Sequence, residues 1–201
     1  MMLMTAAPVD AACRLALALG FDVSKSVSTH DYGIQRDGVA AALADPAVRD
    51  AFLQPDDRVA LAIFEWSGRS YQDVMLTWTL IDSDADLTRV AALVAARVRD
   101  PTPRPTALGR ALEFAAGLFQ TAPDCAAKTL DISGDGRNND GPLPRTVYLS
   151  GYEGVTVNGL AVGGIEADIL TYYQNELIHG PGAFVIHART RDDFQIGRAH
   201  V

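Results

Sequence analysis

The chain has 201 residues, of which 48% are hydrophobic, and a formal net charge of −8, so it is long enough to bury the core of one full domain. The acidic balance, with a pI near 4.8 and only the two lysines Lys25 and Lys128, argues against nucleic acid and anionic membrane surfaces as partners. No apolar run approaches the length needed to span a bilayer, so the sequence predicts no membrane span.

The two ends of the chain read differently from its middle. Residues 1–12 contain small residues that resemble a signal-peptide cleavage region but lack a basic leader and a long apolar stretch, so they are either an irregular tail or the remnant of an export signal. Residues 195–201 match an in-frame translation of a common sequencing adapter and would then be non-native; an ordinary polar tail is the alternative. We therefore expect one domain over residues 13–194, whose final helix starts near Asp192 and is cut short, leaving an apolar groove exposed.

The first half of the chain predicts three strands and two helices. A continuous apolar run over residues 15–21, ending in Asp22, is typical of a strand buried on both faces of a sheet. Ser28 and Asp31 have the spacing of a capping box in front of a helical pattern. The other elements predicted here are a helix over residues 32–43, strands over residues 58–66 and 74–80 joined by a turn at Ser67-Gly68, and a helix over residues 84–99.

The second half of the chain continues to alternate strands and helices. The proline-rich segment 101–105 ends the preceding helix, and Thr106 opens a new helix that runs to Phe119. The remaining predicted elements are strands over residues 130–133, 156–162 and 183–187 and helices over residues 144–149 and 167–177. This alternation predicts an α/β fold of the doubly wound class, with a mostly parallel six-stranded sheet, helices on both faces and one antiparallel edge strand.

Three separate segments place oxygen-bearing side chains at one edge of the predicted sheet. Asp-x-Ser-x-Ser follows the first strand, a threonine opens a helix, and Asp-Gly follows the fourth strand. Each pattern alone is also common in turns and helix caps, but their order and shared edge favour a metal site. Two carboxylates and three hydroxyls suit a hard cation such as Mg²⁺ or Mn²⁺. The predicted metal ligands are Asp22, Ser24, Ser26, Thr106 and Asp135.

This arrangement resembles the metal-ion-dependent adhesion site (MIDAS) of von Willebrand factor type A domains. The chain is more closely similar to a bacterial family of unknown function that carries this domain (domain of unknown function 1194). The stretches that carry the closer resemblance are Gln35 to Leu43, Glu65 to Gly68, Trp78 to Asp82, Asp131 to Asn139, Val157 to Leu160 and Gly180 to Val185. Two departures are Pro105, where related domains often carry glycine, and Lys25, where a small residue is common.

The resemblance implies a non-enzymatic, metal-dependent protein-binding module. Ser24 and Ser26 would bind the metal directly, and Thr106 and one of the aspartates would bind it directly or through water. An acidic residue of a protein partner would replace a metal-bound water. Specificity would then come from residues around the metal, which we call the rim. The rim residues expected from the sequence are Lys25, Arg104, Arg137 and Asn138.

A Mg²⁺-dependent phosphohydrolase or phosphotransferase on a similar sheet is the alternative function. Such chemistry would need a second acid two residues after Asp22, where this chain has Ser24, and a lysine near the phosphate. The candidate, Lys128, falls at the opposite end of the fourth strand. We therefore expect that the protein is not an enzyme.

Cys13 and Cys125 each precede one of two strands that should be neighbours, so they are candidates for a disulfide. Such a bridge would stabilise the fold by roughly 4 kcal/mol in the chain-entropy model. Two unpaired buried cysteines are the alternative. A disulfide would favour an exported protein, either periplasmic or extracellular.

Overall fold

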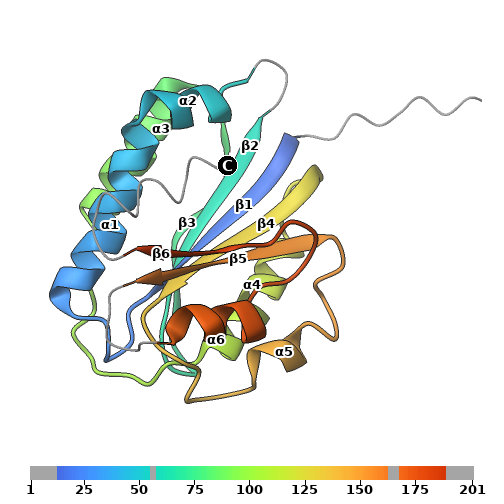
Figure 1. The fold of residues 1–201 in the computed structure, drawn as a ribbon. Coiled ribbons are helices and arrows are strands. Elements are labelled where there is room, and N and C mark those ends of the chain that lie inside the picture. The colour runs from blue at the N-terminus through green and yellow to red at the C-terminus, as the bar shows by residue number, and fades with distance from the viewer. Residues whose placement is uncertain (1–12, 55–57, 163–167, 189–201) are drawn as a thin grey trace, which may run out of the picture.

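A six-stranded sheet forms the centre of the computed structural model, which describes residues 13–54, 58–162 and 168–188 (Figure 1). The elements in chain order are β1 (Cys13–Asp22), α1 (Thr29–Ala44), α2 (Pro46–Phe52), β2 (Val59–Trp66), β3 (Gln72–Ile81), α3 (Asp84–Ala95), α4 (Leu108–Phe119), β4 (Cys125–Gly134), α5 (Pro144–Val147), β5 (Val155–Val162), α6 (Ile169–Glu176) and β6 (Val185–Ala188). The tails over residues 1–12 and 195–201, and the helix expected to begin near Asp192, lie outside the described residues.

The strand order across the sheet is β3-β2-β1-β4-β5-β6. All neighbouring strands run parallel except β2 and β3, which pair antiparallel at one edge. Helices α1, α2 and α3 cover one face of the sheet, and α4, α5 and α6 cover the other (Figure 1). The predicted fold class, including the antiparallel edge strand, is confirmed.

Strand β1 lies at the centre of the sheet because its side chains are apolar on both faces. Leu17 and Phe21 pack in the cluster under α1, α2 and α3, whereas Ala16 and Ala18 pack in the cluster under α4 and α6. Gly20 is required by close packing, since a Cβ atom there would lie 2.8 Å from the Phe64 ring. A central parallel strand of this kind carries its last residue, here the carboxylate Asp22, to the end of the sheet where ligands bind in folds of this class.

Several element boundaries differ from those expected. Helix α2 was not predicted, although Asp45 caps it by accepting hydrogen bonds from the N–H groups of Ala47 (2.8 Å) and Val48 (3.4 Å). Strand β4 starts at Cys125 rather than at residue 130 because it pairs with β1 along its whole length. Its first part has no alternating pattern to reveal it, as Ala126 and Ala127 are both exposed.

Helices α3 and α4 are each shorter than expected, at the ends that face the candidate site. Helix α3 ends at Ala95 rather than at Arg99. Helix α4 begins at Leu108, so Thr106 precedes the helix instead of opening it. In both places tertiary hydrogen bonds, described below, replace the helical ones.

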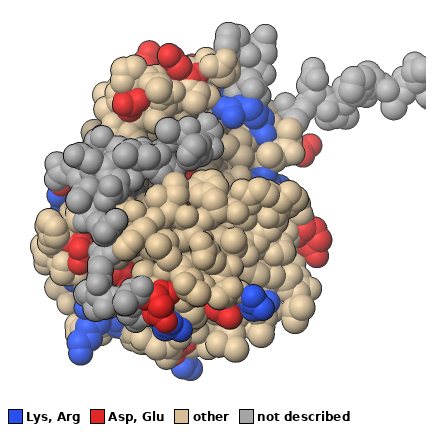
Figure 2. All heavy atoms as spheres, in the orientation of Figure 1, with Lys and Arg blue, Asp and Glu red and all other residues tan. Residues whose placement is uncertain are grey.

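A disulfide joins Cys13 to Cys125, the first residues of β1 and β4. The two residues lie directly opposite each other in the parallel pairing, with their Cα atoms 4.5 Å apart. Among the described residues, no helix is both long and apolar enough to cross a membrane. On the face shown in Figure 2, the described Lys and Arg side chains are scattered rather than gathered into one patch.

Candidate metal site

The two predicted metal carboxylates leave neighbouring parallel strands at the same edge of the sheet. Phe21 of β1 lies opposite Ser133 of β4. Asp22 is the last residue of β1, and Asp135 directly follows the last residue of β4. The central pairing of the sheet therefore brings together two acids that are far apart in the sequence.

A chain of hydrogen bonds links four of the five predicted ligands. The backbone N–H of Ser24 donates to Asp22 Oδ1 at 2.7 Å. The hydroxyls of Ser24 and Ser26 lie 3.0 Å apart, and Ser26 Oγ donates to Asp135 Oδ1 at 2.7 Å. The serines of the first segment thus reach directly across to the carboxylate of the third.

Thr106 is held at this edge by its backbone. Its N–H donates to Asn139 Oδ1 at 2.9 Å, and its carbonyl accepts from the N–H of Asn139 at 2.9 Å. On the other side, the N–H of Ala107 donates to the carbonyl of Ser67 at the end of β2, at 2.8 Å. Thr106 is buried, with a relative exposure of 3%, and so lies between the loops that follow β2 and β4.

The electrostatics of Asp22 are unfavourable without a cation. Asp22 is fully buried, and burial together with the charge of Asp135 raises the pKa of its carboxyl to about 7, although hydrogen bonds from Ser24 oppose the shift. Asp22 Oδ2 has no hydrogen-bond partner among the described residues. A buried acceptor in this state costs about 1–3 kcal/mol. A divalent cation would remove both costs, so the residues present fit such an ion.

The number of acidic side chains at this site is too small to identify it as a metal site. Within the described parts of the chain, no group of three or more His, Cys, Asp or Glu side chains is placed to hold a metal ion. The candidate site has two acids, and its other oxygens are hydroxyls. A ligand set of this composition neutralises a divalent charge without exceeding it.

The expected rim residues have well-defined surroundings. Lys25 is exposed, and its backbone N–H donates to the backbone carbonyl of Arg104 at 2.8 Å. The Arg104 guanidinium stacks 3.9 Å above the Tyr71 ring. Arg137 forms an ion pair with Asp168. Lys25 lies between two predicted ligands, Ser24 and Ser26, whereas Arg104 and Arg137 each lie two residues from a predicted ligand.

Asn138 differs from the other rim residues because its side chain serves the fold. Asn138 Oδ1 accepts from the N–H of Gly109 in the first turn of α4 at 3.0 Å, and its Nδ2 donates to the carbonyl of Pro142 at 3.1 Å. Its own N–H donates to the Tyr172 hydroxyl at 3.1 Å. The side chain of Asn138 is thus engaged within the molecule.

Two residues outside the predicted site, Gln35 and Arg99, hold the backbone at the end of β1 and in the loop that follows it. The buried Gln35 donates to the carbonyl of Asp22 at 3.1 Å and accepts from Ser133 Oγ at 2.5 Å. Arg99 donates to the carbonyl of Ser24 at 2.8 Å. The only signal in the sequence was the placement of a polar residue, Gln35, on the apolar face of α1.

A buried acid lies behind the same loop. Glu65, in β2, accepts from the Tyr32 hydroxyl at 2.6 Å and from the Arg97 guanidinium at 2.7 and 3.0 Å. Arg97 also pairs with Asp73. The carboxylate of Glu65 is therefore already paired, and it links β2 to α1 and to the segment that follows α3.

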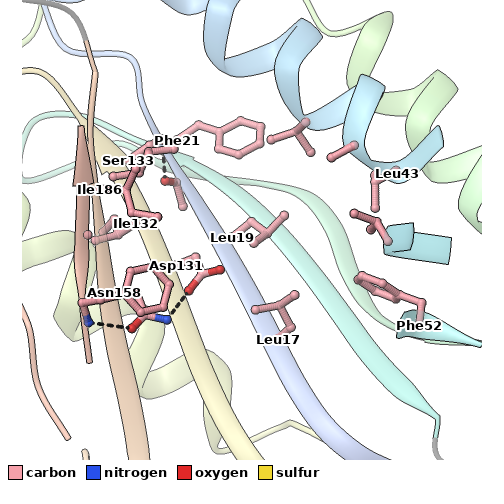
Figure 3. Close-up of a pocket in the computed structure, with 17 residues that line it drawn as sticks. Leu17, Leu19, Phe21, Leu43, Phe52, Asp131, Ile132, Ser133, Asn158 and Ile186 are labelled. Carbon is pink, nitrogen blue, oxygen red and sulfur yellow. Dashed lines mark hydrogen bonds between the residues drawn. The ribbon is translucent and has the colours of Figure 1, made fainter. Parts of the chain in front are cut away.

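An apolar pocket on the sheet is a separate feature. A pocket of about 70 Å³ lies on the α1 face of the sheet, and it contains none of the five predicted ligands. Its wall is mostly aliphatic and aromatic, and Asn158 Nδ2 donates to Asp131 Oδ1 at 2.8 Å at one side (Figure 3). The polar site at the sheet edge and this apolar pocket are distinct.

Comparisons with known proteins agree with this geometry. The model of a family described as "Protein of unknown function (DUF1194)" matches residues 12–197. A search of curated proteins found no match. Many solved structures share the fold, and three of them serve as examples. One is proximal thread matrix protein 1 from the mussel byssus with a zinc-occupied MIDAS motif, at 15% identity and a TM-score of 0.63, with 92% of this chain and 46% of that chain covered. Another is the PilB minor pilin from Streptococcus sanguinis, at 13% identity and a TM-score of 0.68, with 96% of this chain and 61% of that chain covered. The third is von Willebrand factor type A from Catenulispora acidiphila, at 18% identity and a TM-score of 0.62, with 93% of this chain and 42% of that chain covered.

At these identities the likeness shows the fold, which is that of a von Willebrand factor type A domain. The chain spans less than half the length of the mussel and Catenulispora proteins and 61% of the pilin. The site at the carboxyl ends of β1 and β4 must therefore be interpreted from its own residues.

Proposed function

The chain belongs to the family described as protein of unknown function (DUF1194), and from that premise we propose that it is a non-enzymatic, divalent-metal-dependent protein-binding module. The observation that carries this proposal is the hydrogen-bonded chain from Asp22 through Ser24 and Ser26 to Asp135. It gathers hard oxygen ligands around a buried carboxylate, one oxygen of which has no hydrogen-bond partner within the described part of the chain. Mg²⁺ or Mn²⁺ is the cation that this set suits best.

The residues that would hold the ion are the five predicted ones. Asp22 and Asp135 would neutralise its charge, and the hydroxyls of Ser24, Ser26 and Thr106 would add coordination without further charge. Bound there, the ion would supply an electrophilic position at the surface. A carboxylate of a partner protein is the group that such a position prefers.

The rim supports an acidic partner. Lys25, Arg104 and Arg137 are cationic side chains of a chain whose formal net charge is −8, and an acidic partner would compete with Asp100 for Arg104 and with Asp168 for Arg137. Attraction between these side chains and an acidic partner would steer association and weaken as salt is added. No nucleic acid is expected as a partner, because the overall charge opposes it.

The Cys13–Cys125 disulfide favours an exported protein. A disulfide persists in oxidising compartments, such as the bacterial periplasm or the cell exterior. The pilin among the similar folds is consistent with a surface or periplasmic role. The phosphohydrolase alternative gains no support, because Lys128 pairs with Ala16 and Val155 early in β4, far along the strand from Asp135.

Calorimetric titration with Mn²⁺ and Mg²⁺ tests metal binding. The parent protein should bind, and Asp22→Asn and Asp135→Asn should each abolish the heat of binding. Asp124→Asn is the matched control, because Asp124 is an exposed acid directly before β4 whereas Asp135 directly follows it. Equal affinity in Asp22→Asn and in the parent would refute the metal site.

The partner is tested by capture from native extract. Binding should occur in Mg²⁺ or Mn²⁺, disappear in EDTA, and disappear with Ser24→Ala bait. The captured protein should lose binding when one acidic residue is changed to its amide. A protein retained equally by the parent in EDTA and by Ser24→Ala would show that a different surface binds it.

A further inference from the structure

We propose that Asn139 is a positioning residue of the candidate metal site, and that it acts by fixing the backbone of Thr106. This inference rests on the proposed metal binding and deepens it. The loop over residues 135–142 contains one predicted ligand, Asp135. The same loop forms hydrogen bonds with the segment that carries another predicted ligand, Thr106.

Asn139 contacts the backbone of Thr106 on both sides of its Cα atom. The side-chain Oδ1 accepts from the Thr106 N–H at 2.9 Å, and the Asn139 backbone N–H donates to the Thr106 carbonyl at 2.9 Å. The N–H of Asp140 donates to the same carbonyl at 3.2 Å. Two bonds from one residue, to the two peptide groups that flank Thr106, hold this backbone more firmly than one bond does.

Neighbouring residues hold the next part of the Thr106 segment. Ala107, at the N-cap position of α4, makes no side-chain capping bond. Asn138 Oδ1 instead accepts from the N–H of Gly109, so the cap of α4 comes from the loop after β4. The loop and helix approach so closely that a Cβ atom on Gly109 would lie 2.0 Å from the Pro142 carbonyl oxygen.

The loop is also fastened on its far side. The Asp140 carboxylate accepts from the backbone N–H of Arg69 at 3.1 Å and from its Nε at 2.8 Å. Arg69 lies in the turn between β2 and β3, just after Ser67, whose carbonyl holds Ala107. The consecutive residues Asn138, Asn139 and Asp140 therefore bind three different segments around the site.

This arrangement gives Asn139 a specific consequence for the metal. Asp135 precedes Asn139 by four residues, so a displacement of Thr106 relative to Asp135 must break the Asn139 bonds. Groups that orient a metal ligand through hydrogen bonds change metal affinity by about 10–100-fold when removed. The side chain of Asn139 needs no contact with the ion to have this effect.

The test is a double-mutant cycle on Mn²⁺ affinity with full-length protein. Asn139→Ala should weaken Mn²⁺ binding about tenfold, and Asn139→Asp, which keeps the acceptor for the Thr106 N–H, should bind at least as tightly as the parent. In a Thr106→Val background, Asn139→Ala should change the affinity by less than about twofold, because the ligand that it positions is gone. Asn175→Ala is the matched control, since Asn175 is an exposed asparagine at the end of α6.

The possible outcomes distinguish failure of the metal site from failure of the positioning role of Asn139. Absence of Mn²⁺ binding by the parent would overturn the metal site itself. Binding by the parent with unchanged affinity in Asn139→Ala, or with losses that add fully to those of Thr106→Val, would overturn the positioning role alone. Melting in EDTA distinguishes a merely structural effect, which lowers the melting temperature of Asn139→Ala without changing the affinity of the folded protein for Mn²⁺.

Discussion

Ser26 and Asp135, 109 residues apart in the sequence, are joined by a hydrogen bond of 2.7 Å between Ser26 Oγ and Asp135 Oδ1. This bond ties the loop after β1 to the loop after β4, the two central strands of the sheet. A serine hydroxyl can orient toward a carboxylate or toward a cation with little movement of its backbone. The same contact therefore holds the two loops in register and keeps the ligands close together.

The stability of the metal-free protein should depend on pH through Asp22. Its pKa is raised from 3.8 to about 7 in the folded state, so the native protein holds this proton more tightly than the unfolded chain does. The resulting stabilisation is fully present below pH 4 and is lost as the pH rises to about 7, a change of up to about 4 kcal/mol. Denaturant titrations in EDTA between pH 4 and pH 8 measure it.

The comparison with Asp22→Asn isolates this contribution from other titrating groups. The variant should lack the Asp22 part of the pH dependence and should be the more stable protein in EDTA at pH 8. Mg²⁺ should raise the melting temperature of the parent more at pH 8 than at pH 5.5, because protons compete with the ion. Identical pH profiles for the two proteins would contradict the assignment.

Two glycines of α4 should respond oppositely to alanine. Gly109→Ala places a Cβ atom 2.0 Å from the Pro142 carbonyl oxygen, whereas a Cβ atom at Gly117 meets nothing within 4 Å. Gly117→Ala should stabilise by about 0.5–1 kcal/mol through helix propensity. Gly109→Ala should destabilise by about 1–3 kcal/mol, the range for forced overpacking. Thermal unfolding of both variants checks the sign and the difference.

The ion pair of Arg97 with Glu65 should matter far more than an exposed one. Glu65 is fully buried, so Arg97→Ala leaves a buried carboxylate without its cation and should cost about 3 kcal/mol or more. Arg89→Ala, which removes a surface pair with Asp86 within α3, should cost less than about 1 kcal/mol. Chemical denaturation of both variants is the measurement. Equal losses would show that Glu65 does not need Arg97.

Loss of the disulfide should lower stability without affecting the metal. Cys13 and Cys125 are separated by 112 residues, and closing a loop of that length stabilises by about 4–5 kcal/mol in the chain-entropy model. The double variant Cys13→Ala, Cys125→Ala should lose about this much in denaturant titrations while retaining Mn²⁺ affinity. Two freely alkylated thiols in protein taken from its native compartment would contradict the bridge.

The sheet and the residues at the carboxyl ends of its central strands could be predicted because each depends on a short stretch of sequence. An apolar run that ends in Asp22 can be read within ten residues, and so can the serines that follow it. The same holds for the strand that precedes Asp135. Burial on both faces leaves a continuous apolar pattern, and that pattern identifies a central strand without knowledge of its neighbours.

The supports of the site could not be predicted because their partners are remote. Asn139 binds Thr106 at a separation of 33 residues, and Arg99 binds the carbonyl of Ser24 at a separation of 75. Asparagine and arginine at these positions look like ordinary residues of a loop and of a helix end. Only the packing of α3 and α4 against the loops shows which backbone groups they satisfy.

The pairing of Cys13 with Cys125 also has a kinetic consequence. A slip of β4 by one residue against β1 would turn all its side chains to the wrong face. In a chain that refolds with the bridge intact, the first residues of β1 and β4 are already held opposite each other. The entropy cost of bringing these two remote segments together is therefore smaller. Asp22 follows Cys13 by nine residues and Asp135 follows Cys125 by ten. In such a chain, a covalent bond at one end of the sheet therefore favours the register in which the two acids meet at the other end.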